Sequence, residues 1–224
     1  MSNNDQDKLS WAEVIKSSRA RGAIAFCILT LLVIIFYLPY FYQHILEPKT
    51  GVLLHDIVLN VFIPRDWSVL IFTLIYVTIL QTLFSNLRHP DRILIGLSTY
   101  LMVSLLRMAA MYVLTFDPPE HMILLVDPVT SRFYPNSGFA KDLFFSGHIS
   151  TLTIMVLMEK NKVIRFVKIL ATILVALLLA WQHVHYTLDI VVAPLVSIIV
   201  YRLIRNYLQP GFRAVKDMKS VSHV

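Results

Sequence analysis

Six apolar runs, each nearly free of charged residues, constrain the fold of this chain more than any other feature of its sequence. A helix needs about 20 residues to cross the hydrocarbon core of a bilayer, and each run is near or above that length. Hydrophobic residues make up 57% of the 224 residues and charged residues only 15%, which excludes an ordinary soluble domain. The sequence therefore predicts an all-α integral membrane protein, a six-transmembrane-helix bundle. The expected spans are 23–42, 67–85, 93–116, 143–158, 163–182 and 186–205.

The first of these runs is expected to remain in the protein as a span. A secretory signal would end at a cleavage site of small residues, and the sequence LPYF at 38–41 offers none. Cys27 is the single cysteine, so no internal disulfide can form. We expect three regions: an N-terminal cytoplasmic or interfacial segment at 1–21, a six-helix membrane domain at 22–206 and a basic cytoplasmic tail at 207–224.

The distribution of lysine and arginine predicts the orientation of the bundle. Cytoplasmic loops of membrane proteins carry an excess of these residues. If the N-terminus is cytoplasmic, fifteen of the twenty lie on the cytoplasmic side, four lie on the other side, and Arg107 lies within a span. Both termini are therefore expected in the cytoplasm, and the net charge of +6 reflects topology rather than a nucleic-acid partner. The fifteen occur within residues 8–21, 88–92, 160–168 and 202–219.

Several segments carry local structural expectations. The stretch 8–21 mixes apolar and basic residues, as does a helix that lies along an anionic membrane surface, although a solvated tail fits it equally well. Residues 52–64 are too few to cross the bilayer and predict an interfacial or re-entrant helix on the outer side. The loop 117–142 is rich in Pro, Asp and Ser, and its length is typical of a loop that covers a site. Within the last span, Pro194 is a candidate for a kink.

The ionisable residues of HVHYTLD, at 183–189, lie in an apolar neighbourhood. Titratable groups near membrane depth are costly and usually face a cavity, a partner or a substrate path. His185 and Asp189 are four residues apart, so on one helix face the carboxylate can hydrogen-bond the imidazole and leave its other nitrogen free. An imidazole oriented in this way can attack phosphorus.

The segment FFSGHIS, at 144–150, supplies a second histidine. The predicted orientation places both motifs at the outer ends of their spans. His148 can protonate the oxygen that leaves phosphorus. Ser146 and Gly147 precede it at a helix N-terminus, whose free amides and positive dipole end favour a phosphate. Together the two motifs predict phosphate chemistry on a lipid at the outer leaflet.

These residues also carry a specific resemblance to a known family. DLFFSGH, at 142–148, together with HVHYTLD resembles the paired motifs of the sphingomyelin synthase family, a branch of the type 2 phosphatidic acid phosphatase superfamily. The segment RMAAMYVLT, which begins at Arg107 and is soon followed by two prolines, is similar to a third, weaker segment of that family. The likeness covers about residues 50–206.

The resemblance implies a six-helix bundle with its site at the non-cytoplasmic face and a metal-independent transfer through a phosphohistidine. His185 would be the nucleophile, Asp189 its orienting carboxylate, and His148 the general acid and then the general base. The resemblance gives Asp142 and His183 supporting roles near these three residues.

One departure from the broader superfamily concerns the groups that hold the phosphate. The lysine-and-arginine motif of that superfamily has no counterpart here, and Leu179 stands where its arginine precedes the nucleophile. Arg107 is therefore the intramembrane candidate for binding the phosphate, with a purely structural role as the alternative. The other expected substrate-binding residues are Ser146, Gly147, Asp142, His183 and Tyr186.

Several functions stay open from the sequence alone. The first is transfer of a phosphoryl or phospho-head group from a phospholipid to a lipid alcohol such as ceramide or diacylglycerol. With water as the acceptor, the protein would be a lipid phosphate phosphatase. His183, His185 and an aspartate could instead bind zinc in a membrane hydrolase. A transporter or scaffold is the remaining class, but it would need polar residues in the middle of several spans. The expected partners are the phospholipid, its acceptor and the bilayer, and no cofactor is expected.

Overall fold

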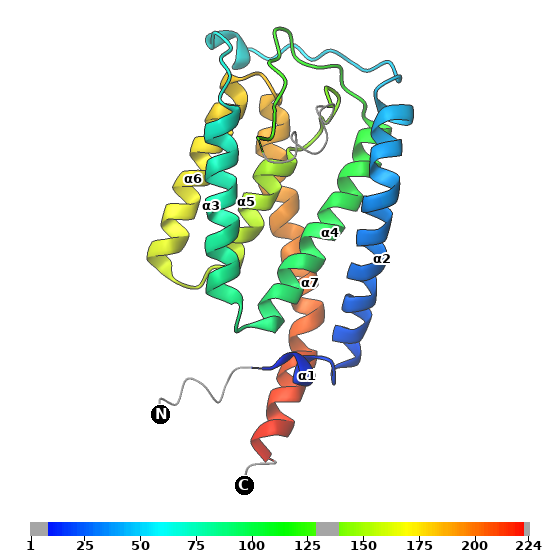
Figure 1. Cartoon of the computed structure of the whole chain (residues 1–224), viewed down its shortest axis with the longest axis vertical. Coiled ribbons are helices and arrows are strands. Elements are labelled where there is room, and N and C mark those ends of the chain that lie inside the picture. The colour runs from blue at the N-terminus through cyan, green and yellow to red at the C-terminus, as the bar shows by residue number, and fades with distance from the viewer. Residues whose placement is uncertain (1–8, 129–138, 222–224) are drawn as a thin grey trace.

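The computed structural model describes residues 9–128 and 139–221 and shows a bundle of long helices (Figure 1). Within these residues there is no strand, apart from an isolated bridge between Val52 and Phe116. The all-α fold class is therefore confirmed. In chain order the elements are α1 Trp11–Val14, α2 Ser18–Tyr40, the π-helix η1 Phe41–Leu46, the 3-10 helix η2 Leu59–Val61, α3 Ser68–Asn86, α4 Pro90–Val113, α5 Gly147–Met158, α6 Lys162–Trp181 and α7 Thr187–Val221.

Five helices of the bundle are long and apolar enough to cross a membrane. They are α2 together with η1, α3, α4, α6 and α7, and they correspond to five of the six expected spans. Large apolar side chains on these helices point outward: Phe36, Phe84 and Phe166 are 59% to 76% exposed. Such surfaces suit the hydrocarbon core of a bilayer rather than water. These features identify a multi-pass membrane protein.

The expected span 143–158 is wrong at its N-terminal end. Helix α5 contains 12 residues, which extend about 18 Å at helical rise against a hydrocarbon core of about 30 Å. Ser146 lies just before the helix and caps it, because its hydroxyl accepts a hydrogen bond from the Ile149 amide. Phe144 and Phe145 have positive φ angles of 66° and 30°, which an α-helix cannot accommodate. The described structure therefore has five long spans and one short helix.

The segment 52–64 does not form the expected interfacial or re-entrant helix. Its backbone is irregular except for the three residues of η2. Val52 pairs instead with another loop: its amide donates to the Thr115 carbonyl at 3.0 Å and its carbonyl accepts from the Asp117 amide at 3.1 Å. Gly51 permits this approach, because a Cβ atom there would lie 2.6 Å from the Asp117 nitrogen. Backbone pairing between loops thus replaces the helix.

The N-terminal segment contains a short helix, α1, of four residues before α2. Leu9 and Val14 are buried in the same apolar cluster as Phe212 and Val215 of α7. Trp11 and Ile15 are 46% and 47% exposed, so a location of this segment along the membrane surface stays a prediction.

Helix α5 is held inside the bundle by neighbours on several sides. It contacts α3, α4, α6 and α7. The longest helix, α7, packs against α4 and α5 and continues as a helix through Pro194 and Pro210. This packing fixes the N-terminus of α5 relative to the start of α7, where the two histidine motifs lie.

The two ends of the bundle carry different segments (Figure 1). The turns from α3 to α4 and from α5 to α6 lie at the same end as α1 and the C-terminal part of α7, and the long loops lie at the other end. The basic segments therefore gather at one end, although the side that faces the cytoplasm stays a prediction. Lys168 lies near the same end but is buried in the bundle, with its Nζ 3.0 Å from Glu159.

Candidate active site

Two histidines from distant parts of the chain meet at the end of the bundle that carries the long loops. His148 is in the first turn of α5, and His185 lies just before α7. Their ring centroids are 6.1 Å apart. The Ser146 amide donates a hydrogen bond to the Asp189 carbonyl at 3.1 Å, which ties the start of α5 to the start of α7. The structure therefore brings together the two motifs that the sequence indicates.

Asp189 lies beside His185, as their four-residue spacing predicts. Its Oδ2 atom is 3.5 Å from His185 Nδ1, at the outer limit of a hydrogen bond. The same oxygen accepts a hydrogen bond from the Tyr186 amide at 3.2 Å. The side chains of His185 and Asp189 are 1% and 0% exposed. The carboxylate is thus positioned to orient the imidazole while it also stabilises the start of α7.

Several buried polar atoms in this cluster have no hydrogen-bond partner among the described residues. They are His148 Nδ1, both ring nitrogens of His185, Asp189 Oδ1 and Ser150 Oγ. A buried polar atom without a partner is unfavourable and uncommon in native proteins. Water or a polar ligand is the usual partner of such atoms. This property marks the cluster as a candidate site independently of the sequence motifs.

Arg107 reaches from α4 to the start of α5. Its Nη2 atom forms an ion pair with Asp142 at 2.8 Å, and its Nε donates to the Phe145 carbonyl at 2.8 Å. Tyr42 donates a further hydrogen bond to Asp142. A Cβ atom on Gly147 would lie 2.3 Å from Arg107 Nη1, so glycine is required for the guanidinium to lie against this helix N-terminus. Positive charge is therefore fixed next to the first turn of α5.

The Asp142 carboxyl group is kept ionised by the same neighbours. Burial alone would raise its pKa, but the charge of Arg107 and the hydrogen bond from Tyr42 hold that pKa below its ordinary value of 3.8. The ion pair with Arg107 is therefore present at neutral pH.

A cavity of about 200 Å³ opens beside the cluster. Its lining includes Arg107, Gly147 and His148. A guanidinium and a helix N-terminus in one wall offer positive charge and hydrogen-bond donors to an anion. His185 and Asp189 are not in this lining, although His185 neighbours His148. The cavity thus joins the phosphate-binding candidates to one of the two histidines.

Two other residues of the second motif do not reach this cavity. The ring nitrogens of His183 lie 3.0 Å from the Leu59 and Glu120 carbonyl oxygens. The Tyr186 hydroxyl donates to the Asp117 carbonyl at 2.8 Å. Both side chains thus join the outer loops to the bundle and line a separate cavity of about 240 Å³, so the structure does not bring them to the cavity that His148 lines.

The zinc alternative would need His183 and His185 to bind one ion. Both nitrogens of His183 lie 3.0 Å from loop carbonyl oxygens, so neither is free to bind an ion together with His185. Among the residues that the structure describes, no three His, Cys, Asp or Glu side chains form a group that could hold a metal. The geometry therefore gives this alternative no site.

Two residues that hold the site were not among the sequence-based candidates. Tyr42 binds Asp142, and it gave no signal because tyrosines are common near the ends of membrane spans. Gln182 is fully buried; its side chain accepts from the Trp67 amide at 2.8 Å and donates to Ser68 Oγ at 3.1 Å. A lone glutamine at the end of an apolar run was the available signal for this second residue.

Comparison with protein-family models gives a match in the C-terminal half of the chain. Residues 141–207 match the family model described as PAP2 superfamily C-terminal. The matched stretch includes His148, His185 and Asp189, whereas Arg107 lies before it. The match concerns the superfamily and does not single out its sphingomyelin synthase branch. No curated protein matches the chain.

Proposed function

We propose that this protein transfers a phosphoryl or phospho-head group from a phospholipid to a lipid alcohol, such as ceramide or diacylglycerol, through a phosphohistidine at His185. The observation that carries the proposal is the approach of the His148 and His185 rings to 6.1 Å beside Asp189. The similarity of residues 141–207 to the PAP2 superfamily supports it, since members of that superfamily are phosphatases or phosphotransferases.

The first step is attack on phosphorus. Asp189 faces Nδ1 of His185, which leaves Nε2 as the nucleophile. A nitrogen–phosphorus bond forms, and the bond from phosphorus to the leaving oxygen breaks. The negative charge of the bound phosphate favours the protonated form of His148, which gives its proton to that oxygen, so the first product leaves as a neutral alcohol.

The second step transfers the group to the acceptor. His148, now neutral, takes the proton of the acceptor hydroxyl while the hydroxyl oxygen attacks phosphorus. The new oxygen–phosphorus bond forms as the nitrogen–phosphorus bond breaks, and the His185 ring is regenerated. Each histidine therefore ends the cycle in the protonation state in which it began.

The phosphate oxygens would be held at the start of α5. The free amides of the first helical turn and the Arg107 guanidinium line one side of the cavity and can bind the negative charge. His185 is 1% exposed, so lipid binding must displace the side chains that cover its ring. The uneven distribution of basic residues supports a site on the non-cytoplasmic face.

The decisive assay uses purified protein in liposomes with a phospholipid labelled in its head group and phosphate. Ceramide or diacylglycerol is added as acceptor, with and without a chelator. We expect a new labelled phospholipid that forms equally well with chelator. Turnover that the chelator abolishes would contradict the metal-independent mechanism. Absence of turnover with every donor and acceptor would contradict the proposed transfer reaction.

Hydrolysis is the second candidate function. The superfamily match supports it as well as transfer, because both reactions share the covalent step and differ only in the acceptor. In the same liposome assay, free labelled phosphate or phospho-head group that forms without a lipid acceptor would identify water as the acceptor.

Replacing Arg107 with glutamine is expected to lower kcat/KM about a hundredfold, as for the loss of one oxyanion donor. The reason is that the guanidinium beside Gly147 would no longer bind the phosphate oxygens. Initial rates over a range of donor concentrations in mixed micelles measure the change.

The double variant Arg107→Gln/Asp142→Asn separates this role from a structural one. It removes both charges of the 2.8 Å ion pair, so it leaves no unpaired carboxylate near the cavity. Recovery of activity in the double variant would mean that Arg107 serves only to neutralise Asp142. Activity that stays low while thermal stability recovers is the result expected for a phosphate-binding arginine.

A further inference from the structure

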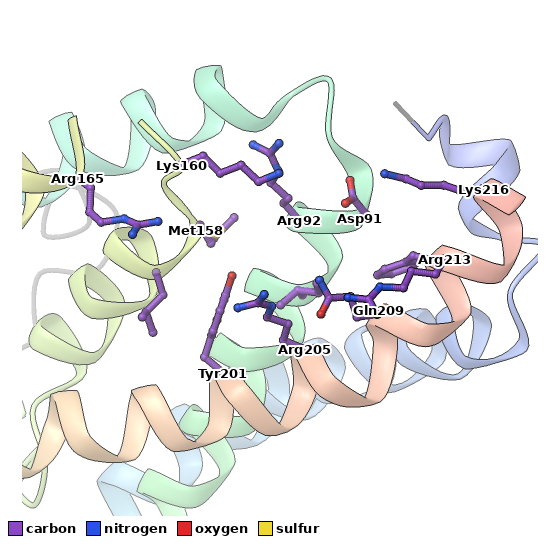
Figure 2. A pocket seen from close by; sticks show the side chains of 13 residues that line it. Asp91, Arg92, Met158, Lys160, Arg165, Tyr201, Arg205, Gln209, Arg213 and Lys216 are labelled. Atoms are coloured by element: carbon purple, nitrogen blue, oxygen red, sulfur yellow. The ribbon is translucent and has the colours of Figure 1, made fainter. Parts of the chain in front are cut away.

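A second and larger cavity, seen from close by in Figure 2, lies at the end of the bundle that carries the turns from α3 to α4 and from α5 to α6, away from the histidines (Figure 1). Its volume is about 360 Å³, within the range of small-molecule binding sites. The start of α4, the turn from α5 to α6 and the C-terminal half of α7 form its walls. Met158, which lines it, is ten residues from His148 on the same helix, or about 15 Å at helical rise. We call this cavity the basic hollow.

The charge of the basic hollow is strongly positive. Asp91 is the only acidic residue in its lining. Figure 2 shows the side chains of Arg92 and Lys160 on one side and those of Tyr201 and Arg205 on the other. The cationic residues of the lining are Arg92, Lys160, Arg165, Arg205, Arg213 and Lys216.

None of these six cations forms an ion pair with a carboxylate within the described part of the chain, and Asp91 is the one negative charge in their lining. The nearby Glu159 is engaged by Lys168. Arg165 donates to the Glu159 carbonyl and Arg92 to the Asn86 side chain at 3.4 Å, and both partners are uncharged. The positive charge of the hollow therefore remains available to a ligand.

The crowding of like charges is unfavourable when the hollow is empty. Burial lowers the pKa of Lys160 and the charge of Arg92 lowers it further, Asp91 raises it in part, and Lys216 and Arg205 lower it again. An anion in the hollow would relieve this repulsion, because each cation would then face a negative group at short range. The arrangement is thus better suited to an occupied site than to an empty one.

The surroundings of the hollow indicate the source of the anion. Val163 of α6 and Leu203 of α7 are 72% and 63% exposed, so apolar surface for lipid begins close in sequence to Arg165 and Arg205. Basic pockets between membrane helices bind head groups of anionic lipids that carry several phosphate charges. Tyr201 and Gln209 also line the hollow and can hydrogen-bond the hydroxyl groups of such a head group.

We propose that the basic hollow binds a lipid head group that carries more than one phosphate, at a site separate from the histidine cluster. The ligand's phosphates would bind the arginines and lysines from three segments of the chain, and its acyl chains would lie along α6 and α7. This site requires no chemistry at His148 or His185, so it is independent of the proposed reaction.

The test measures binding of a short-chain phosphatidylinositol bisphosphate to the purified full chain in neutral detergent micelles. The variant Lys160→Gln/Arg205→Gln removes two cations of the hollow, and we expect it to weaken binding about thirtyfold. The matched control Lys162→Gln/Arg202→Gln removes two exposed cations from the neighbouring positions of the same segments, outside the lining. It lowers the net charge equally and is expected to bind nearly as well as the unmodified protein.

A second probe, inositol trisphosphate without acyl chains, separates the two sources of the same anion. Binding that is much weaker than that of the lipid identifies a membrane lipid as the ligand, and equal binding identifies a soluble polyphosphate. His185→Ala is expected to bind both probes unchanged, because it alters only the other end of the bundle. Equal weakening in the two double variants, or no binding of either probe, would overturn the proposal.

Discussion

Replacement of His185 by alanine is expected to lower turnover about a thousandfold or more, as for the loss of a catalytic group in a covalent mechanism. Neither of the other two histidines of the motifs can replace it, since His148 is needed for proton transfer and His183 is bound to loop carbonyls. Release of labelled product from the liposome assay measures the effect. Because neither His185 nitrogen has a hydrogen-bond partner among the described residues, apart from the 3.5 Å approach of Asp189 to Nδ1, the substitution is expected to disturb the fold little.

Trapping of the covalent intermediate gives the same prediction a second measurement. Rapid quenching in alkali, where phosphohistidine survives, should leave label on the unmodified protein and none on His185→Ala. The matched control is His55→Ala, because His55 is an exposed histidine of the outer loops. Normal labelling and turnover in His185→Ala would eliminate this residue as the nucleophile, whereas loss of both in His55→Ala as well would point to a general effect on the loops.

The bundle could be predicted from the sequence where length and hydropathy alone decide the structure. Five long apolar helices overlap the predicted runs, because a bilayer requires internally bonded backbone over about 20 residues. The last of them, α7, continues to Val221, however, past the expected end of its span at 205 and through most of the expected tail. The prediction failed for 143–158, where positive φ angles at Phe144 and Phe145 shorten α5. It also failed for 52–64, where the bonds of Val52 to another loop replace a helix. Both errors concern contacts between distant segments, which hydropathy does not encode.

The candidate site could be predicted only in part, because the sequence shows local spacing but not the direction of the backbone. The spacing of His185 and Asp189 and the position of His148 at a helix start are local features, and the structure brings all three together. His183 and Tyr186 belong to the same short motif, but the turn before α7 directs them to the loops. A motif identifies which residues lie near a site, whereas backbone direction decides which side chains face it.

Lys168 and Glu159 form a buried ion pair at the end of the bundle away from the histidines. Lys168 and Glu159 have side chains that are 4% and 6% exposed, with Nζ and Oε2 3.0 Å apart. Thr82 accepts from Lys168 at 2.8 Å, and the amides of Lys160 and Asn161 each donate to Glu159 Oε1 at 3.0 Å. Each charge therefore has several partners, and removal of one charge leaves the other buried and unpaired.

Lys168→Met is expected to lower the free energy of unfolding by about 3–5 kcal/mol, because it leaves the Glu159 carboxylate without a cation. Reversible unfolding in mixed detergent micelles measures this change. Lys162→Met is the matched control, since Lys162 is exposed on the same helix, and its effect should stay within about 0.5 kcal/mol. An effect of Lys168→Met as small as that of the control would show that the ion pair does not stabilise the bundle.

The double variant Lys168→Met/Glu159→Gln should be more stable than Lys168→Met alone, because the glutamine oxygen still accepts the loop amides and no unpaired charge remains.

The dependence of unfolding on acid provides an independent measurement of the same ion pair. Burial alone would raise the pKa of Glu159, but the Asn161 amide and Lys168 hold it below its ordinary value of 4.5. The ionised carboxylate therefore contributes stability above pH 4.5 that is lost as the pH falls through the lower folded pKa. Glu159→Gln should remove this part of the acid dependence, and an unchanged pH profile would mean that other carboxylates control unfolding in acid.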